Sequence, residues 1–168
     1  IKGIEILKNY PYQKLIHPRY HKHCILVASK TEFKINESNG FSTISCCGLN
    51  FIPVHLNSFS ALKRFDDSLI LAKFAKKISN IIILGDTNIW SRGNNFLFNN
   101  DKKAYKIFTE VMKDFSRKLI STTYLGLSLD KVFGSKNIQV IEIESPRIRS
   151  YFMDHYPIFF NILYNDRE

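Results

Sequence analysis

Hydrophobic and polar positions along the chain alternate in a way that predicts many short strands and few helices. Strands are predicted over residues 24–29, 41–47, 49–55, 81–84, 119–124, 129–133, 138–143 and 158–164. Helical spacing predicts helices over 60–79 and 101–116 and the end of a helix over 1–9. The remaining segments 10–21 and 90–100 are predicted to be loops. This order predicts one strand-rich α/β domain that covers residues 1–168.

The two long helices have amphipathic patterns. In the first, the predicted buried face consists of Leu62, Phe65, Leu69, Ala72 and Ala75. Polar residues, Arg64 and Asp67 among them, stand between these positions. In the second, the predicted buried face consists of Ala104, Phe108, Met112 and Phe115. Ser60 is the predicted N-cap of the first helix.

The segment 81–90 contains the strongest functional signal. Four aliphatic residues, Ile81 to Leu84, predict a strand buried on both faces, and Gly85 ends it. Asp86 and Asn88 then stand two residues apart at the carboxyl end of the strand, where α/β proteins hold their ligands. Two small polar side chains at that edge suit phosphate or metal chemistry. Alone, the pair is more typical of a turn that closes a strand.

Other chemically capable residues also stand at strand ends. His55 follows an apolar strand, Asp130 begins one, and the pair Asp154-His155 precedes the last one. Taken singly, His55 and Asp130 are ordinary edge and turn residues. An adjacent acid and imidazole are more informative, because a carboxylate raises the basicity of an imidazole and fixes its tautomer.

The order of these motifs is specific: strand-His-Leu, strand-Gly-Asp-x-Asn, Leu-Asp-x-Val-strand and Asp-His-x-Pro-strand. In this order the chain resembles the endonuclease/exonuclease/phosphatase superfamily, the metal-dependent phosphodiesterases related to pancreatic-type deoxyribonuclease. Further matches are the segments 10–12 (Tyr-Pro-Tyr), 28–30 (Ala-Ser-Lys) and 90–91 (Trp-Ser). Met153 departs from the usual Ser of the final motif.

The resemblance implies a four-layer α/β/β/α sandwich and assigns catalytic roles. His155 would activate or orient water, and Asp130 would hold its tautomer. Asp86 would position or protonate at the scissile phosphate. His55 would donate a hydrogen bond to the phosphoryl oxygens. Asn88 would bind a phosphate oxygen.

The same resemblance implies a divalent cation, Mg²⁺ or Mn²⁺, held by Asp154 and Asp86. It implies hydrolysis of a phosphodiester or phosphomonoester, with DNA or RNA as substrate, or alternatively a phospholipid or an inositol phosphate. The expected state is a monomer without an obligate protein partner. The location is open between the cytoplasm and anchoring or export through a segment before residue 1.

The resemblance also implies that the first strands of the fold precede this sequence. The family carries its principal metal ligand, a Glu in a Gln-Glu motif, on an early strand, and an Asn on the strand before it. Glu5 stands on the predicted helix end and is not assigned this role. The alternative function is therefore a degenerate, non-catalytic domain that binds nucleic acid or phosphorylated ligands.

Composition agrees with a basic globular domain. Lys and Arg (24) outnumber Asp and Glu (15), which gives a net charge of +9 and favours polyanionic partners or a solvated basic surface. The three cysteines are predicted to be buried thiols, because Cys24, Cys46 and Cys47 lie in apolar segments without metal-binding spacing. His17, His21 and His23 have a spacing that suits zinc, but nothing completes the site, and a basic loop is the preferred interpretation.

Overall fold

A six-stranded mixed sheet forms the centre of the molecule. The computed structural model describes residues 8–17, 24–92, 95–147 and 154–164. The strands of the sheet lie in the order β3 (Lys34–Ser38), β4 (Phe41–Cys46), β5 (Leu49–His55), β6 (Ile81–Asp86), β10 (Asp130–Gly134) and β9 (Lys113–Asp114). Strands β5 and β6 are parallel, and the other neighbours are antiparallel.

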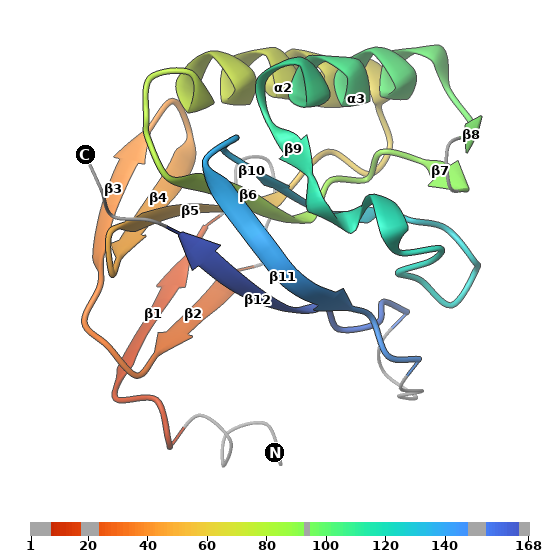
Figure 1. Ribbon diagram of the computed structural model, residues 1–168. Helices are drawn as coiled ribbons and strands as arrows, with labels where there is room; N and C mark the ends of the chain where they lie inside the picture. Colours follow the sequence, from red (N-terminus) through yellow and green to blue (C-terminus); the bar gives the residue numbers. More distant parts are fainter. Residues whose placement is uncertain (1–7, 18–23, 93–94, 148–153, 165–168) are drawn as a thin grey trace.

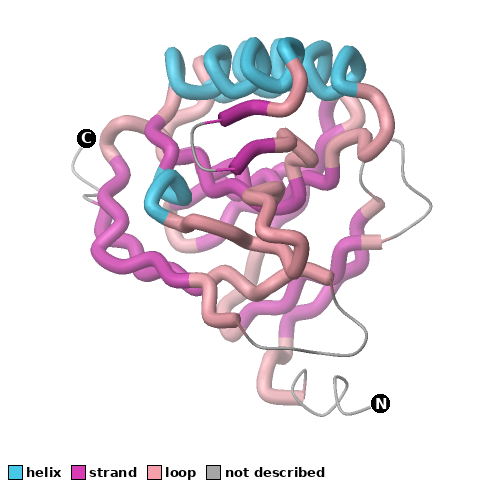
Figure 2. Tube along the Cα trace, turned by 90° about the vertical axis from the view of Figure 1, so that its right-hand side faces the viewer, coloured by secondary structure: helices cyan, strands magenta, loops and turns pink. Residues whose placement is uncertain are grey.

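Two helices cover one face of this sheet (Figures 1 and 2). They are α2 (Ala61–Ala75), which connects the parallel strands, and α3 (Asn99–Val111). Fully buried side chains such as Ile52, Ile83, Phe108 and Phe133 form the core between helices and sheet. The rings of Phe108 and Phe133 are stacked with centroids 4.6 Å apart. Among the described residues, no helix is long and apolar enough to cross a membrane.

Two strand pairs lie on the other face of the sheet (Figure 1). They are β1 (Tyr12–Ile16) with β2 (Ile25–Ser29), and β11 (Ile138–Glu144) with β12 (Phe159–Tyr164). The second pair packs on a smaller core around Ile82 and Val132. The first pair leaves an apolar cavity of about 440 Å³ between β2 and the sheet. The shorter elements are β7 (Ser91–Arg92), β8 (Asn95–Phe96) and the 3-10 helix η1 (Phe115–Lys118).

The predicted α/β sandwich is confirmed by this layering. The strand 81–84 is indeed buried on both faces: Ile81, Ile82 and Ile83 are each 0% exposed. Most of the helix end predicted over 1–9 lies outside the described residues, and residues 8 and 9 form a turn.

Strand predictions were wrong in several segments. Strands β7 and β8 lie in the predicted loop 90–100, and β9 lies in the predicted helix 101–116. The predicted loop 10–21 contains β1, and β3 was not predicted, because both strands are defined by pairing with a distant partner. The segment 119–124 is not a strand. There the backbone N–H groups of Thr122 and Thr123 both donate to the carbonyl of Leu127, so the chain closes into a compact turn instead.

The predicted buried face of α2 was only partly right, since Ala72 and Ala75 are buried. Its buried residues are Arg64, Asp67, Ser68, Leu71, Ala72 and Ala75, whereas Leu62 is 58% exposed. The buried face was partly misassigned because three of the observed buried positions, Arg64, Asp67 and Ser68, carry polar residues. The N-cap prediction is confirmed: the Oγ of Ser60 accepts a hydrogen bond from the backbone N–H of Lys63.

The cysteine prediction was wrong as well. Cys24 and Cys47 are exposed, and Cys46 is only partly buried. Cys46 is the last residue of β4, and Cys47 lies in the two-residue turn to β5, which places both beyond the apolar part of the hairpin.

Candidate active site

Strand register places three of the predicted residues in one row across the sheet. His55 pairs with Asp86 between the parallel strands β5 and β6. Asp86 pairs with Asp130 between the antiparallel strands β6 and β10. Because the carboxyl ends of β5 and β6 meet the start of β10, three segments distant in sequence supply neighbouring polar side chains at one sheet edge.

Gly85 allows this row to form. Its φ of 125° lies in a region that side-chain-bearing residues rarely adopt, and a Cβ there would lie 2.3 Å from the carbonyl oxygen of Val54. The backbones of β5 and β6 therefore approach each other at the position immediately before Asp86.

His155 enters the row from the segment between β11 and β12. A β-bridge between His155 and Thr123 holds its backbone, and the N–H of Tyr156 donates to the carbonyl of Thr122. The ring Nδ1 then lies 2.7 Å from Oδ2 of Asp130, and Nε2 lies 3.9 Å from Oδ2 of Asp86. The sequence-predicted pair of Asp130 and His155 is thus in direct contact.

The acidic surroundings favour the protonated form of His155. The hydrogen bond to Asp130 raises the pKa of His155 to about 9, with partial burial opposing the rise. The negative charges of Asp130, Asp86 and Asp154 raise the pKa further. The free protein therefore holds an imidazolium at neutral pH.

His55 and Asn88 complete the cluster in different ways. The Nε2 of His55 lies 3.3 Å from Oδ2 of Asp86, and its side chain is 30% exposed. Asn88, with a φ of 49°, is buried, and its Nδ2 donates to the carbonyl of Leu56. The side-chain amide of Asn88 thus holds the segment after β5, and its backbone N–H donates to Oδ1 of Asp86.

Donor atoms for a metal are present in this cluster. One ligand atom each of Asp86, Asp130 and His155 lie within 4.8 Å of one another, a set of two carboxylates and an imidazole that suits a divalent cation. Asp154, the other predicted ligand, has a 90% exposed side chain with Oδ1 4.0 Å from Nε2 of His155. Its carboxylate therefore lies at the solvent edge of the same cluster.

A buried ion pair behind the cluster was missed by the sequence analysis. Arg64 of α2 and Asp101 of α3 are almost fully buried and form two parallel hydrogen bonds of 2.7 and 2.9 Å. The guanidinium also donates to the carbonyl of Asn57, and the Asp101 carboxylate accepts from the backbone N–H of Trp90. The pair therefore ties together the loops that follow His55 and Asn88. No local pattern could have revealed it, because the partners are 37 positions apart.

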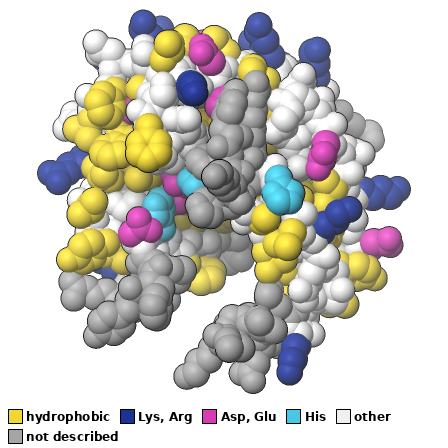
Figure 3. Space-filling view, turned by 180° about the vertical axis from the view of Figure 1, so that it is seen from behind, with side chains coloured by type: hydrophobic (Ala, Val, Ile, Leu, Met, Phe, Trp, Pro, Cys, Tyr) yellow, Lys and Arg dark blue, Asp and Glu magenta, His cyan; other side chains and the backbone are white. Residues whose placement is uncertain are grey.

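The cluster reaches the surface. Figure 3 shows histidine and acidic side chains next to one another on the face seen from behind, beside a group of hydrophobic side chains. Of the three histidines whose spacing suits zinc, His21 and His23 lie outside the described residues. His17 contacts the thiol of Cys24 at 3.5 Å instead.

Solved structures of endonuclease/exonuclease/phosphatase family proteins have the fold of this chain, which confirms the fold that the resemblance implies. No protein-family model matches the sequence, and no curated protein matches it.

Solved structures share the fold at low identity. An endonuclease/exonuclease/phosphatase family protein from Bacteroides thetaiotaomicron has a TM-score of 0.70 at 16% identity, over 98% of this chain and 79% of that chain. The mannosyl-6-phosphatase Bt3783 of the same organism has a TM-score of 0.65 at 14% identity, over 96% and 80%. The 3′ phosphatase NExo from Neisseria, bound to a product DNA hairpin, has a TM-score of 0.75 at 10% identity, over 96% and 82%.

Proposed function

We propose that this protein hydrolyses a phosphate ester with a divalent cation, and that a phosphodiester is its substrate. The observation that carries the proposal is the row of His55, Asp86 and Asp130, with His155 bound to Asp130, at one edge of the sheet. Phosphoryl hydrolysis requires an aligned nucleophile, charge neutralisation and help for the leaving group. Imidazoles and carboxylates in contact provide groups for each of these tasks.

His155 and Asp130 act together in this proposal. Asp130 accepts from Nδ1–H and so leaves Nε2 directed towards Asp86 and the solvent side of the cluster. In its protonated form the ring donates from Nε2 to a phosphate oxygen. In its neutral form the same nitrogen orients or deprotonates the attacking water. His55, which is 30% exposed, donates to the phosphoryl oxygens as negative charge develops on them.

Asp86 and the exposed carboxylate of Asp154 are proposed to hold Mg²⁺ or Mn²⁺, because hard cations prefer oxygen ligands. When bound, the cation would neutralise phosphate charge and lower the pKa of the neighbouring imidazole.

A nucleic acid is the proposed substrate. The net charge of +9 favours a polyanion. Of the structures with this fold, NExo was solved with a product DNA hairpin, whereas Bt3783 is a mannosyl-6-phosphatase. Because the fold accommodates both kinds of substrate, substrates of both kinds belong in the test, together with a phospholipid and an inositol phosphate.

The test is hydrolysis by the 168-residue chain with Mg²⁺ or Mn²⁺. The substrates are bis(p-nitrophenyl) phosphate, plasmid DNA, a sugar phosphate, a phospholipid and an inositol phosphate. His155→Ala should lower the rate by about 10²- to 10⁴-fold, the usual contribution of a positioned acid or base. EDTA should abolish the activity. His17→Ala, which removes an exposed histidine outside the cluster, is the matched control and should retain the activity.

Equal rates for the His155→Ala variant and the unchanged chain would contradict the proposal. A folded chain that binds an oligonucleotide without hydrolysing any of the substrates would instead support the non-catalytic, basic domain.

A further inference from the structure

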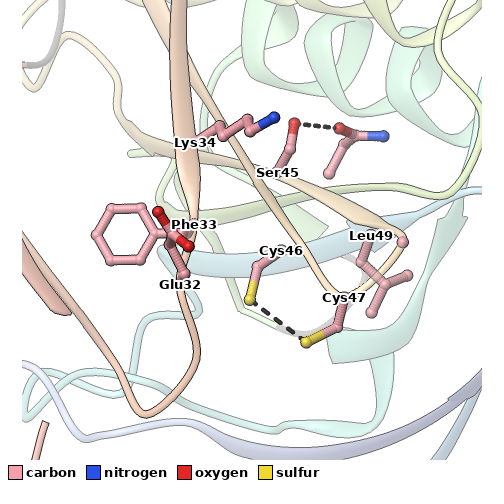
Figure 4. A pocket seen from close by; sticks show the side chains of 9 residues that line it. Glu32, Phe33, Lys34, Ser45, Cys46, Cys47 and Leu49 are labelled. Carbon is pink, nitrogen blue, oxygen red and sulfur yellow. Dashed lines mark hydrogen bonds between the residues drawn. The ribbon is translucent and has the colours of Figure 1, made fainter. Parts of the chain in front are cut away.

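A small pocket lies at the far end of the central sheet from the His-Asp row (Figure 4). It has a volume of about 300 Å³. One wall is the segment 32–34, and the other is the turn from β4 to β5, residues 45–50. The sulfur atoms of Cys46 and Cys47 point towards each other in this pocket (Figure 4).

The geometry gathers three polar atoms. The two sulfur atoms are 3.5 Å apart, and Oγ1 of Thr31 lies 3.0 Å from the sulfur of Cys46 and 3.5 Å from that of Cys47. Successive side chains of a strand point to opposite faces. Here the turn brings both thiols to one side, because Cys47 has a φ of 51°.

Cysteine is an unusual choice at this turn position. The preceding turn, from β3 to β4, also has two residues with positive φ, Asn39 (54°) and Gly40 (77°), and Asn-Gly is the sequence that such turns favour. Cys47 and Gly48 (73°) adopt the same conformation. At position 47 the chain therefore has a cysteine in the left-handed conformation, where asparagine would be more favourable. Such an outlier motivates a functional hypothesis.

We propose that Cys46 and Cys47 form a binding site for a thiophilic divalent metal ion such as Zn²⁺ or Cd²⁺. Two thiolates around a tetrahedral ion with metal–sulfur bonds of about 2.3 Å stand roughly 3.8 Å apart, close to the spacing present. Binding replaces the two S–H protons by two metal–sulfur bonds and releases two protons. Water completes the coordination of the ion.

The hydroxyl of Thr31 prepares this site for a cation. Its oxygen lies within hydrogen-bond distance of both sulfur atoms, so its O–H can donate to the thiolates that a metal requires. The site differs from the His-Asp row in chemistry and in place. Strand β5 separates them by seven residues, or roughly 20 Å.

The test measures the ultraviolet charge-transfer absorbance that forms when Cd²⁺ binds thiolate sulfur, in a protein kept reduced with a phosphine. This signal ignores cations that bind only to the carboxylates and imidazoles of the row. The background variant is Cys24→Ser, which removes the thiol beside His17. Cys46→Ser and Cys47→Ser are added singly, and Asp86→Asn serves as the control for the other site.

The Cys24→Ser chain should bind one Cd²⁺ with full absorbance, and Zn²⁺ should compete for it. Loss of a partner that only supports a metal ligand costs roughly 10- to 100-fold in affinity, so either added serine should weaken binding by at least that factor. Asp86→Asn should leave the absorbance unchanged. The proposal is overturned if the Cys24→Ser chain shows no absorbance band. It is also overturned if the band persists in each of the two variants that carry one added serine.

Discussion

The two ends of strand β5 differ in chemistry and in support. At its carboxyl end, His55 stands in a row of half-buried nitrogen and oxygen donors, each held by a partner from another element. At its amino end, a two-residue turn presents the exposed thiol of Cys47. In our two proposals, one strand carries a rigid site for hard, charged ligands at one end and an open site for soft ligands at the other. What separates them is the structure packed behind each end.

The buried pair of Arg64 and Asp101 is the clearest part of that difference. It fixes the loops behind the His-Asp row through hydrogen bonds to Asn57 and Trp90. The turn at Cys47 instead relies on its own hairpin and on Thr31. We therefore expect substitutions at the two ends to affect stability very differently.

The largest expected loss of stability comes from Arg64→Ala, which leaves the Asp101 carboxylate buried without its partner. Breaking a buried pair in this way costs about 3–5 kcal/mol in the free energy of unfolding. Urea denaturation measures it. Lys63→Ala, which removes the exposed cation next to it on α2, should change the free energy of unfolding by no more than about 0.5 kcal/mol. Similar losses in both variants would show that the pair does not brace this end.

An intermediate effect is expected for Asp130→Asn, which removes the negative charge that holds the imidazolium. Hydrolysis should fall by roughly 10- to 100-fold, as for other residues that orient a functional ligand. The pKa of His155 should fall from about 9 towards its ordinary value of 6.5. Titration of the ring signals by NMR in EDTA measures the pKa directly. Asp66→Asn, the same change at an exposed position of α2, is the control and should alter neither quantity.

The stability of the Asp130→Asn variant relative to the unchanged chain is expected to depend on pH. Because the pKa of His155 is raised on folding, its pairing with Asp130 stabilises the folded state fully below pH 6.5 and is lost as the pH rises through about 9. The difference in unfolding free energy between the unchanged chain and Asp130→Asn should therefore shrink across this range. A constant difference would mean that His155 and Asp130 are not coupled.

The smallest expected effect concerns the turn. Cys47→Asn restores the preferred Asn-Gly sequence and should raise the free energy of unfolding by up to about 1 kcal/mol. Asn39→Cys in the preceding turn, which has the same conformation, should lower it by a similar amount. Thermal denaturation of both variants measures the effect. Changes of the same sign in the two turns would refute the conformational argument.

The sequence was most informative where local pattern and local structure agree. The four aliphatic residues from Ile81 predicted a strand buried on both faces, and the motif order predicted the contact between Asp130 and His155. The contacts of Asn88 with Leu56 and of Thr123 with His155 were not predictable, because they depend on how distant segments meet.

Arg64 shows why the remainder was missed. A buried arginine breaks the hydrophobic pattern of α2, so the pattern gave only part of the buried face, Ala72 and Ala75. The carboxylate that makes its burial possible lies on another helix, 37 positions further on. Strands β1 and β3 were missed for the same reason, since long-range pairing defines them.

The row across β5, β6 and β10 would make the proposed hydrolysis a reporter of strand alignment. His55, Asp86 and Asp130 stand together only in one register, and a slip of one residue in either ladder turns a side chain to the opposite face of the sheet. A misaligned chain would keep its secondary structure and much of its compactness. Its hydrolytic rate would vanish, so an activity assay would detect a slip in strand register that circular dichroism would not detect.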